Sequence, residues 1–142
     1  MLERKVDELA LRDKVVFAGW VGPAQKADFF KACDVICSPS AWDTQPLTVL
    51  ETFAWGKALV ATDIPGPSSC YEHERTALVV PPKDSVAMAA ALLRLKEDPA
   101  LRARLAANGR RQAMAEHADA EVARLLDLRV KALVELFAGR AA

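Results

Sequence analysis

The amino-acid sequence predicts an α/β fold: a Rossmann-like, doubly wound and mostly parallel sheet, truncated at its N-terminal side, with extra C-terminal helices. Short apolar runs alternate along the chain with longer segments of helical periodicity, and strands joined through helices run parallel. Proline and glycine mark the ends of these segments, as they do at helix ends and in turns. The four predicted strands cover residues 15–19, 35–37, 58–62 and 77–80.

Helical segments connect and follow these strands. Pro46 lies just inside the start of one helix and Gly56 just past its end, which is the usual placement of these two residue types. Asp84 or Ser85 can cap the helix after the last strand. Residues 63–76 contain two prolines and a glycine and are predicted to form a loop. The predicted helices cover residues 2–11, 23–33, 46–55, 85–96, 99–116 and 119–137.

The composition is that of an ordinary globular protein, and residues 1–142 are predicted to form a single domain. Nineteen basic residues balance nineteen acidic ones, so no nucleic-acid partner is indicated. No apolar run approaches the ~20 residues that span a membrane, and no signal peptide is recognised. We therefore expect a cytoplasmic protein without a transmembrane segment.

Three cysteines are expected to be small core residues in a reducing compartment: Cys33, Cys37 and Cys70. They have no further ligands beside them in the sequence, so we expect no metal site. Trp20 and Trp55 are expected in the core, whereas Trp42 is placed where it could stack on a base or a sugar. The two histidines are expected at the surface or in packing rather than in catalysis.

The stretch from Ser38 to Gly56 carries the main functional signal. It leads from a predicted strand through a loop into a helix. This order places unpaired amide N–H groups at the carboxyl edge of the sheet, where α/β proteins bind phosphates. Two carboxylates flank the turn, Asp43 in the loop and Glu51 in the second turn of the helix.

On the helix, Thr48 shares a face with Glu51. The expected apolar side of the helix consists of Leu47, Leu50 and Ala54. An ionised carboxylate accepts two hydroxyl donors at once, so the two acids suit the vicinal diols of a ribose and a hexose. The plainer alternative is that Asp43 caps the helix and Glu51 is a solvated surface charge.

The segment SPSAWDTQPLTVLETFAWG, followed by LVATD, resembles the E-x7-E segment of retaining glycosyltransferases of group 1 (family 4), which have the GT-B fold. Three further blocks resemble that family in the same order: VVFAGWV, FFKACDVICSPS and ALVVPPKD. The resemblance runs from about residue 5 to the C-terminus. It implies that residues 1–142 are a partial C-terminal domain of such an enzyme, the domain that binds the nucleotide-sugar donor.

The resemblance also implies roles for individual residues. Glu51 would accept hydrogen bonds from the nucleotide ribose, and Asp43, where the family more often has Glu, would contact hydroxyls of the donor sugar. Thr48 would donate its hydroxyl to a phosphate oxygen. The other implied donor-binding residues are Gly19, Val21, Ser40, Thr44, Gln45, Pro46 and Leu47. Gly19 and Val21 match a turn that lines the nucleobase pocket, with a plain strand-to-helix turn as an equal alternative.

The family contains parts that this chain lacks. GT-B enzymes bind the acceptor with an N-terminal lobe, and a βαβ unit of roughly 30 residues precedes the strand that matches residues 15–19. In the strand order 3-2-1-4-5-6, the loss of strands 1 and 2 separates residues 15–19 from the other strands and leaves an unpaired edge. We therefore expect a missing N-terminal lobe, a homodimer, or pairing of residues 15–19 with residues 35–39.

Three functions follow as hypotheses. The first is the donor-binding part of a glycosyltransferase that takes a UDP- or GDP-sugar as substrate and needs no metal or other cofactor. The second is a non-catalytic transferase domain that acts as an interaction module. The third is a nucleotide-sugar epimerase of similar overall fold, for which we identify no catalytic acids or histidine.

Overall fold

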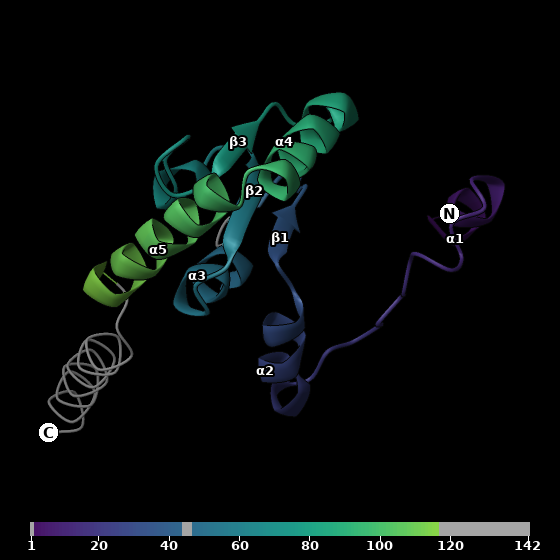
Figure 1. Ribbon diagram of the computed structural model, residues 1–142, viewed down its shortest axis with the longest axis horizontal. Helices are drawn as coiled ribbons and strands as arrows, with labels where there is room; N and C mark the ends of the chain where they lie inside the picture. The colour runs from purple at the N-terminus through teal and green to yellow at the C-terminus, as the bar shows by residue number, and fades with distance from the viewer. Residues whose placement is uncertain (1, 44–46, 117–142) are drawn as a thin grey trace, which may run out of the picture. The chain divides into compact units, whose positions relative to one another are not determined.

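The structure, a computed structural model, describes residues 2–43 and 47–116 (Figure 1). The chain divides into two units, residues 1–32 and residues 33–142. The first unit holds the helices α1 (Leu2–Glu8) and α2 (Pro23–Ala32). The described part of the second unit holds a sheet with its helices.

In the first unit α1 ends at Glu8, earlier than the predicted residue 11. Ala10 has a positive φ of 51°, and the Leu11 N–H donates a hydrogen bond to the Val6 carbonyl oxygen 2.9 Å away. A left-handed residue followed by this bond is the Schellman pattern, which closes the last turn of a helix. Leu9 and Ala10 therefore belong to the turn after the helix.

The strand predicted at residues 15–19 is wrong. These residues form no strand, and the first strand among the described residues is β1 (Val35–Ser38). The side chain of Val16 is 89% exposed, so the segment is not buried either. A strand needs a neighbouring strand to bond its backbone groups, and the described residues supply none for this segment.

The second unit is built on three parallel strands, β1, β2 (Ala58–Thr62) and β3 (Leu78–Val80), in that order (Figure 1). Every residue of β2 is buried, as expected for a central strand covered on both faces. The predicted α/β class with a parallel sheet is thus confirmed, with three strands in the described residues instead of four.

Three helices accompany the sheet: α3 (Leu47–Ala54), α4 (Ser85–Glu97) and α5 (Pro99–Glu116). Alternate residues of β2 and β3 pack against α4 and α5 in one apolar cluster, as the period of two in a strand requires. The buried members of this cluster are Ala58, Val60, Leu78, Val80, Ala91, Leu95, Leu101 and Leu105.

Helix α3 ends as predicted and buries a different face. Gly56, with φ of 62°, follows the helix, and the Lys57 N–H donates to the Thr52 carbonyl oxygen at 3.0 Å, again a Schellman ending. The buried residues of the helix are Val49, Thr52 and Phe53. The predicted apolar side is therefore wrong, since Leu47 is 61% exposed and Ala54 is exposed as well.

The reason is the close approach of α3 and α5. A Cβ atom added to Gly109 of α5 would lie 2.4 Å from Cδ1 of Phe53. The bare glycine thus makes room for the ring, and this contact selects the face of α3 that turns inward.

The ends of the last two described helices agree with the prediction. Asp84 caps α4, its Oδ1 accepting a hydrogen bond from the Ala87 N–H at 2.8 Å. Asp98 accepts from the Leu101 N–H at 2.8 Å in the same way at the start of α5. The helix predicted at 119–137 lies outside the described residues.

Several predicted core residues lie at the surface. The side chains of Trp20 and Trp55 are exposed, with 91% of Trp20 accessible to solvent. Cys37 is exposed as well, while Cys33 and Cys70 are half-buried, and all three thiols are free. Within the part of the chain that the structure describes, no helix has the length and apolar character needed to cross a bilayer.

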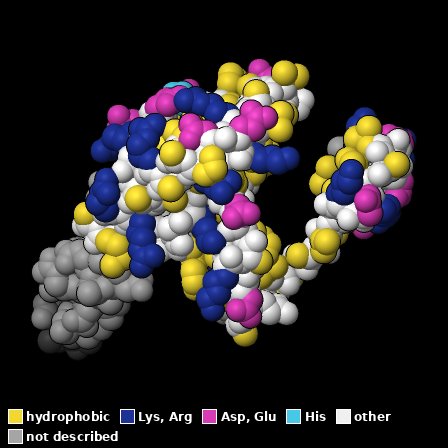
Figure 2. Space-filling view, in the orientation of Figure 1, with side chains coloured by type: hydrophobic (Ala, Val, Ile, Leu, Met, Phe, Trp, Pro, Cys, Tyr) yellow, Lys and Arg dark blue, Asp and Glu magenta, His cyan; other side chains and the backbone are white. Residues whose placement is uncertain are grey.

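Basic side chains gather along α5, although the chain as a whole has no net charge (Figure 2). Arg102 donates to the carbonyl oxygen of Leu95 at 3.2 Å, and Arg111 donates to the Asn108 side chain at 2.5 Å. These arginines thus brace backbone and side-chain oxygens of the same unit.

Candidate functional site

The carboxyl ends of the three strands meet at one edge of the sheet, because the strands are parallel. Two hollows lie at this edge. One, of about 220 Å³, is lined by Pro39, Thr62, Lys83, Asp84, Ser85 and Met88. The other, of about 330 Å³, is lined by Asp63, His73, Val79, Val80, Pro81 and Pro82. Sheet edges of this kind are where α/β proteins hold ligands.

Asp43 lies in the loop that leaves β1 at this edge, and its side chain is half-buried. Upstream in the same loop, the carbonyl oxygen of Ser40 accepts a hydrogen bond from Thr62 Oγ1 at 2.5 Å. The loop that carries the first predicted acid is therefore tied to the end of β2.

Glu51 lies on α3 and is half-buried. Thr48, one turn earlier, is exposed, and its carbonyl oxygen accepts a hydrogen bond from Thr52 Oγ1 at 2.6 Å. Neither Thr48 nor Glu51 belongs to the buried residues of the helix, which are Val49, Thr52 and Phe53. Leu47, at the start of the helix, is exposed too.

The structure thus gathers five predicted site residues on the β1–loop–α3 segment of the second unit: Ser40, Asp43, Leu47, Thr48 and Glu51. Thr44, Gln45 and Pro46 lie outside the described residues. Gly19 and Val21 belong to the first unit. Gly19 has φ of 63°, and nothing lies within 4 Å of the Cβ that it lacks, so it forms an open turn. Its assignment to a nucleobase pocket stays a prediction.

Sequence reasoning missed a buried tyrosine behind this edge. Tyr71 donates its hydroxyl proton to the Thr62 carbonyl oxygen at 2.6 Å. Burial, together with the charges of Asp63, Cys70 and Asp43, raises the pKa of Tyr71 to about 12. The hydroxyl therefore stays protonated at neutral pH. A sequence signal for this arrangement is Thr62, the polar residue that ends the otherwise apolar strand β2.

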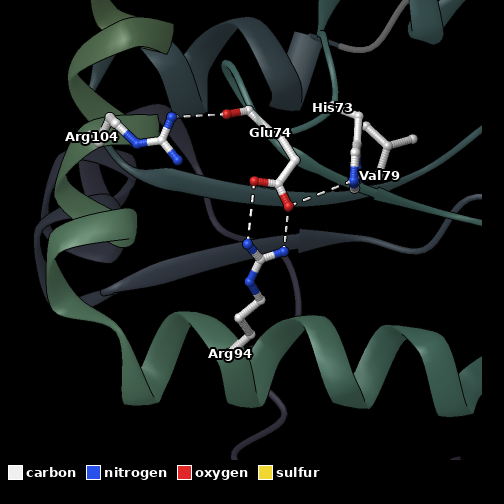
Figure 3. Close-up of polar contacts among 5 residues, drawn as sticks. All are labelled: His73, Glu74, Val79, Arg94 and Arg104. Atoms are coloured by element: carbon white, nitrogen blue, oxygen red, sulfur yellow. Dashed lines mark hydrogen bonds and ion pairs between the residues drawn. The ribbon is translucent and has the colours of Figure 1, made fainter.

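The loop between β2 and β3 contains a short 3-10 helix, η1 (Pro67–Cys70), and returns to the sheet through a polar cluster (Figure 3). Arg94 of α4 holds the Glu74 carboxylate with two hydrogen bonds. Arg104 of α5 donates to the Glu74 carbonyl oxygen at 3.2 Å. His73 Nδ1 accepts a hydrogen bond from the Val79 N–H at 3.0 Å. These hydrogen bonds fix the loop against β3, α4 and α5.

The paired guanidinium has an electrostatic consequence. The hydrogen bonds from Arg94 hold the pKa of Glu74 below its ordinary value, with smaller contributions from the charges of His73 and Arg104. Glu74 also has a positive φ of 62°, which is uncommon for a residue with a side chain. The ion pair thus accompanies an unusual backbone turn.

Among residues 2–43 and 47–116, no group of three or more His, Cys, Asp or Glu side chains is arranged to hold a metal ion. That the reaction proceeds without a metal stays a prediction.

Comparison with known proteins gives the family. The family described as glycosyl transferases group 1 matches residues 1–112. The lipopolysaccharide core biosynthesis glycosyltransferase LpsD of Rhizobium meliloti (strain 1021) is 42% identical over 108 residues, which are 76% of this chain and 31% of LpsD. The chain thus spans about a third of that relative.

The fold recurs in solved structures of other proteins. The sucrose-phosphate synthase from Thermosynechococcus elongatus superimposes with a TM-score of 0.86 at 30% identity, over 95% of this chain and 34% of that one. The C-terminal domain of a glycosyl transferase group 1 family protein, LpcC from Francisella tularensis, does so with a TM-score of 0.75 at 26% identity, over 82% of this chain and 60% of that one. With the family match covering most of its length, this chain belongs to the group 1 glycosyl transferases.

Proposed function

We propose that this chain is the donor-binding part of a glycosyltransferase that moves a hexose from a UDP- or GDP-sugar to an acceptor glycan or lipid. The observation that carries the proposal is the placement of Asp43 and Glu51 on one strand–loop–helix segment at the carboxyl edge of a parallel sheet. Membership of the group 1 family supports it.

The chemistry assigns a task to each part of the segment. Glu51 accepts hydrogen bonds from the ribose hydroxyls, and Asp43 accepts them from the donor sugar. The amides at the start of α3 and the Thr48 hydroxyl meet the diphosphate. As the bond between the anomeric carbon and the diphosphate breaks, these donors stabilise the charge that develops on the leaving oxygen. The acceptor hydroxyl forms the new bond to the anomeric carbon and passes its proton to the oxygen of the departing diphosphate, on which the charge has developed.

The acceptor is the part of the reaction for which the described residues offer no assigned group. We propose that a further lobe, or a second copy of the chain, supplies the acceptor site. Among the described strands β1 pairs with β2 alone, and an edge of this kind can accept another strand. Light scattering on the purified chain tests the second copy: a dimer supports it, and a monomer that still binds nucleotide contradicts it.

The proposed function is tested by calorimetric titration of the chain with UDP, GDP and ADP. We expect one nucleotide to bind, and Glu51→Ala to weaken that binding by about 1.5–3 kcal/mol, as for a hydrogen bond to a charged group. Glu97→Ala, which removes an exposed acid from the end of α4, is the matched control and should bind like the wild type.

Two further outcomes separate the alternatives. If no nucleotide binds at millimolar concentration although the chain is folded, the donor-site proposal fails, and a fragment with an incomplete site or an interaction module is left as the alternative. If a nucleotide sugar binds and is epimerised rather than transferred, the activity is that of an epimerase.

We also propose that nucleotide binding needs no metal and that the protein is cytoplasmic. A titration in excess EDTA that leaves the affinity for the nucleotide unchanged supports the proposal that no metal is needed.

A further inference from the structure

A buried threonine joins two loops at the carboxyl edge of the sheet. Thr62 is the last residue of β2, opposite Val80 of β3, and is only 3% exposed. Its hydroxyl donates to the carbonyl oxygen of Ser40 at 2.5 Å, and the carbonyl oxygen of Ser38 lies farther off at 3.4 Å. A hydroxyl has one proton to donate, so the shorter contact, to Ser40, is the hydrogen bond.

This hydrogen bond holds the chain just after the strand ladder ends. β1 ends at Ser38, and Pro39 has no N–H with which to continue the ladder. The side chain of Thr62 therefore takes the place of a backbone partner for residue 40. Asp43 follows three residues later, within about 10 Å of extended chain. Fixing Ser40 thus restricts where the Asp43 carboxylate can lie.

The backbone of Thr62 is in turn held by a hydrogen bond from Tyr71. The Tyr71 hydroxyl donates to the Thr62 carbonyl oxygen at 2.6 Å, and Tyr71 is 8% exposed. A tyrosine hydroxyl is protonated below its ordinary pKa of about 10, so Tyr71 remains a donor throughout the neutral range. Two hydrogen bonds in series, Tyr71 to Thr62 and Thr62 to Ser40, thus connect the loop after η1 to the loop that bears Asp43.

We infer that Thr62 is a positioning residue for the donor sugar: it acts through Ser40 to place the Asp43 carboxylate, and Tyr71 supports it. The inference rests on the proposed function, in which Asp43 contacts sugar hydroxyls and Glu51 contacts the ribose. The inference therefore predicts different effects on the two parts of the ligand, the sugar and the nucleotide. Loss of the Thr62 hydroxyl should weaken recognition of the sugar and leave recognition of the nucleotide intact.

The test compares Thr62→Val with Thr76→Val. Valine keeps the shape of threonine and removes the hydroxyl. Thr76 is buried to a similar degree, at 1% exposed, and its hydroxyl accepts from the Glu72 N–H at 2.9 Å within its own turn. Affinities for UDP and UDP-glucose, or for GDP and GDP-mannose if the guanine nucleotide binds, are measured on each variant by calorimetry.

We expect Thr62→Val to weaken binding of the nucleotide sugar about tenfold, the effect of one hydrogen bond, and to change binding of the free nucleotide less than about twofold. Thr76→Val should leave the ratio of the two affinities unchanged. In the double variant with Asp43→Asn, the Thr62 effect should disappear, because residues that act through one contact are not additive. Equal weakening of nucleotide and nucleotide sugar, or full additivity, overturns the inference.

A second measurement is independent of ligand. Amide hydrogen exchange in the free protein should become faster at residues 40–43 in Thr62→Val and stay unchanged there in Thr76→Val. Unchanged exchange in Thr62→Val refutes the inference even if nucleotide sugars bind. If the wild type binds no nucleotide, the proposed function fails, and the exchange data alone decide whether Thr62 holds the loop.

Discussion

Two apolar five-residue segments of this chain differ in secondary structure and in burial. Residues 58–62 form a fully buried central strand, whereas residues 15–19, just as apolar, form no strand. The difference lies in the neighbours. β2 has a parallel strand on each side, while residues 15–19 have no paired strand among the described residues. Apolar composition therefore marks a segment that can be a strand, and backbone partners decide whether it is one.

The comparison is tested most strongly by replacing a valine with alanine in each of the two segments. Val60 is 0% exposed and Val16 is 89% exposed. Val60→Ala should lower the free energy of unfolding by about 2–3 kcal/mol, because it removes two buried methyl groups and leaves a cavity. Val16→Ala should change it by less than about 0.5 kcal/mol. Urea denaturation of both variants checks this, and a loss of similar size for Val16→Ala would show that residues 15–19 are buried in solution.

A smaller change in the free energy of unfolding is expected when Gly109, in the second unit, is replaced by alanine. In Gly109→Ala the new Cβ would lie 2.4 Å from Phe53 Cδ1, a clash that costs about 1–3 kcal/mol. The better helix propensity of alanine offsets about 1 kcal/mol of this cost, so a net loss of up to roughly 2 kcal/mol is expected.

Gly22→Ala is the matched control, since the nearest atom to its new Cβ is 3.8 Å away. Its thermal midpoint should stay within a few degrees of the wild type, as a change below about 0.5 kcal/mol predicts. A stable Gly109→Ala protein would contradict the close packing of α3 on α5.

The smallest effect concerns two carboxylates paired with arginine, Asp7 with Arg12 in the first unit and Glu74 with Arg94 in the second. Hydrogen bonds from these arginines lower the pKa of both carboxyls. Each pair therefore stabilises the protein at pH values above the ordinary carboxyl pKa, and the contribution is lost as pH falls through the lowered pKa. Both pairs are exposed, so the change in stability is small.

The measurement for these pairs is an NMR titration of the side-chain carboxyls. Both midpoints should lie below those of unpaired acids, and Arg94→Ala should raise that of Glu74 while leaving that of Asp7 unchanged. A Glu74 midpoint that does not respond to Arg94→Ala would contradict the pairing.

Local signals predicted much of the fold. Pro99, Asp84 and Gly56 mark helix ends where the structure has them, because caps and turns depend on the few residues beside them. The inward face of α3 could not be predicted, since it is set by the contact of Phe53 with Gly109 far along the chain. The strand at 15–19 failed for the same reason: its pairing is not a local property.

The site shows the same division. The positions of Asp43 in the loop after β1 and of Glu51 on α3 could be predicted, because strand, loop and helix follow one another in the sequence. The hydrogen bonds from Tyr71 to Thr62 and from Thr62 to Ser40 could not be predicted. They join residues from separate segments, which meet only when β2 lies beside β1.

The central claim, that a nucleotide-sugar donor binds at the carboxyl edge of the sheet, is tested most directly by mapping amide chemical shifts during titration with UDP-glucose and GDP-mannose. We expect one ligand to shift residues 38–43 and 47–51 and the edge residues around Thr62, while α5 beyond Arg102 stays unchanged. Shifts confined to α5, or none with a folded chain at millimolar ligand, would contradict the account.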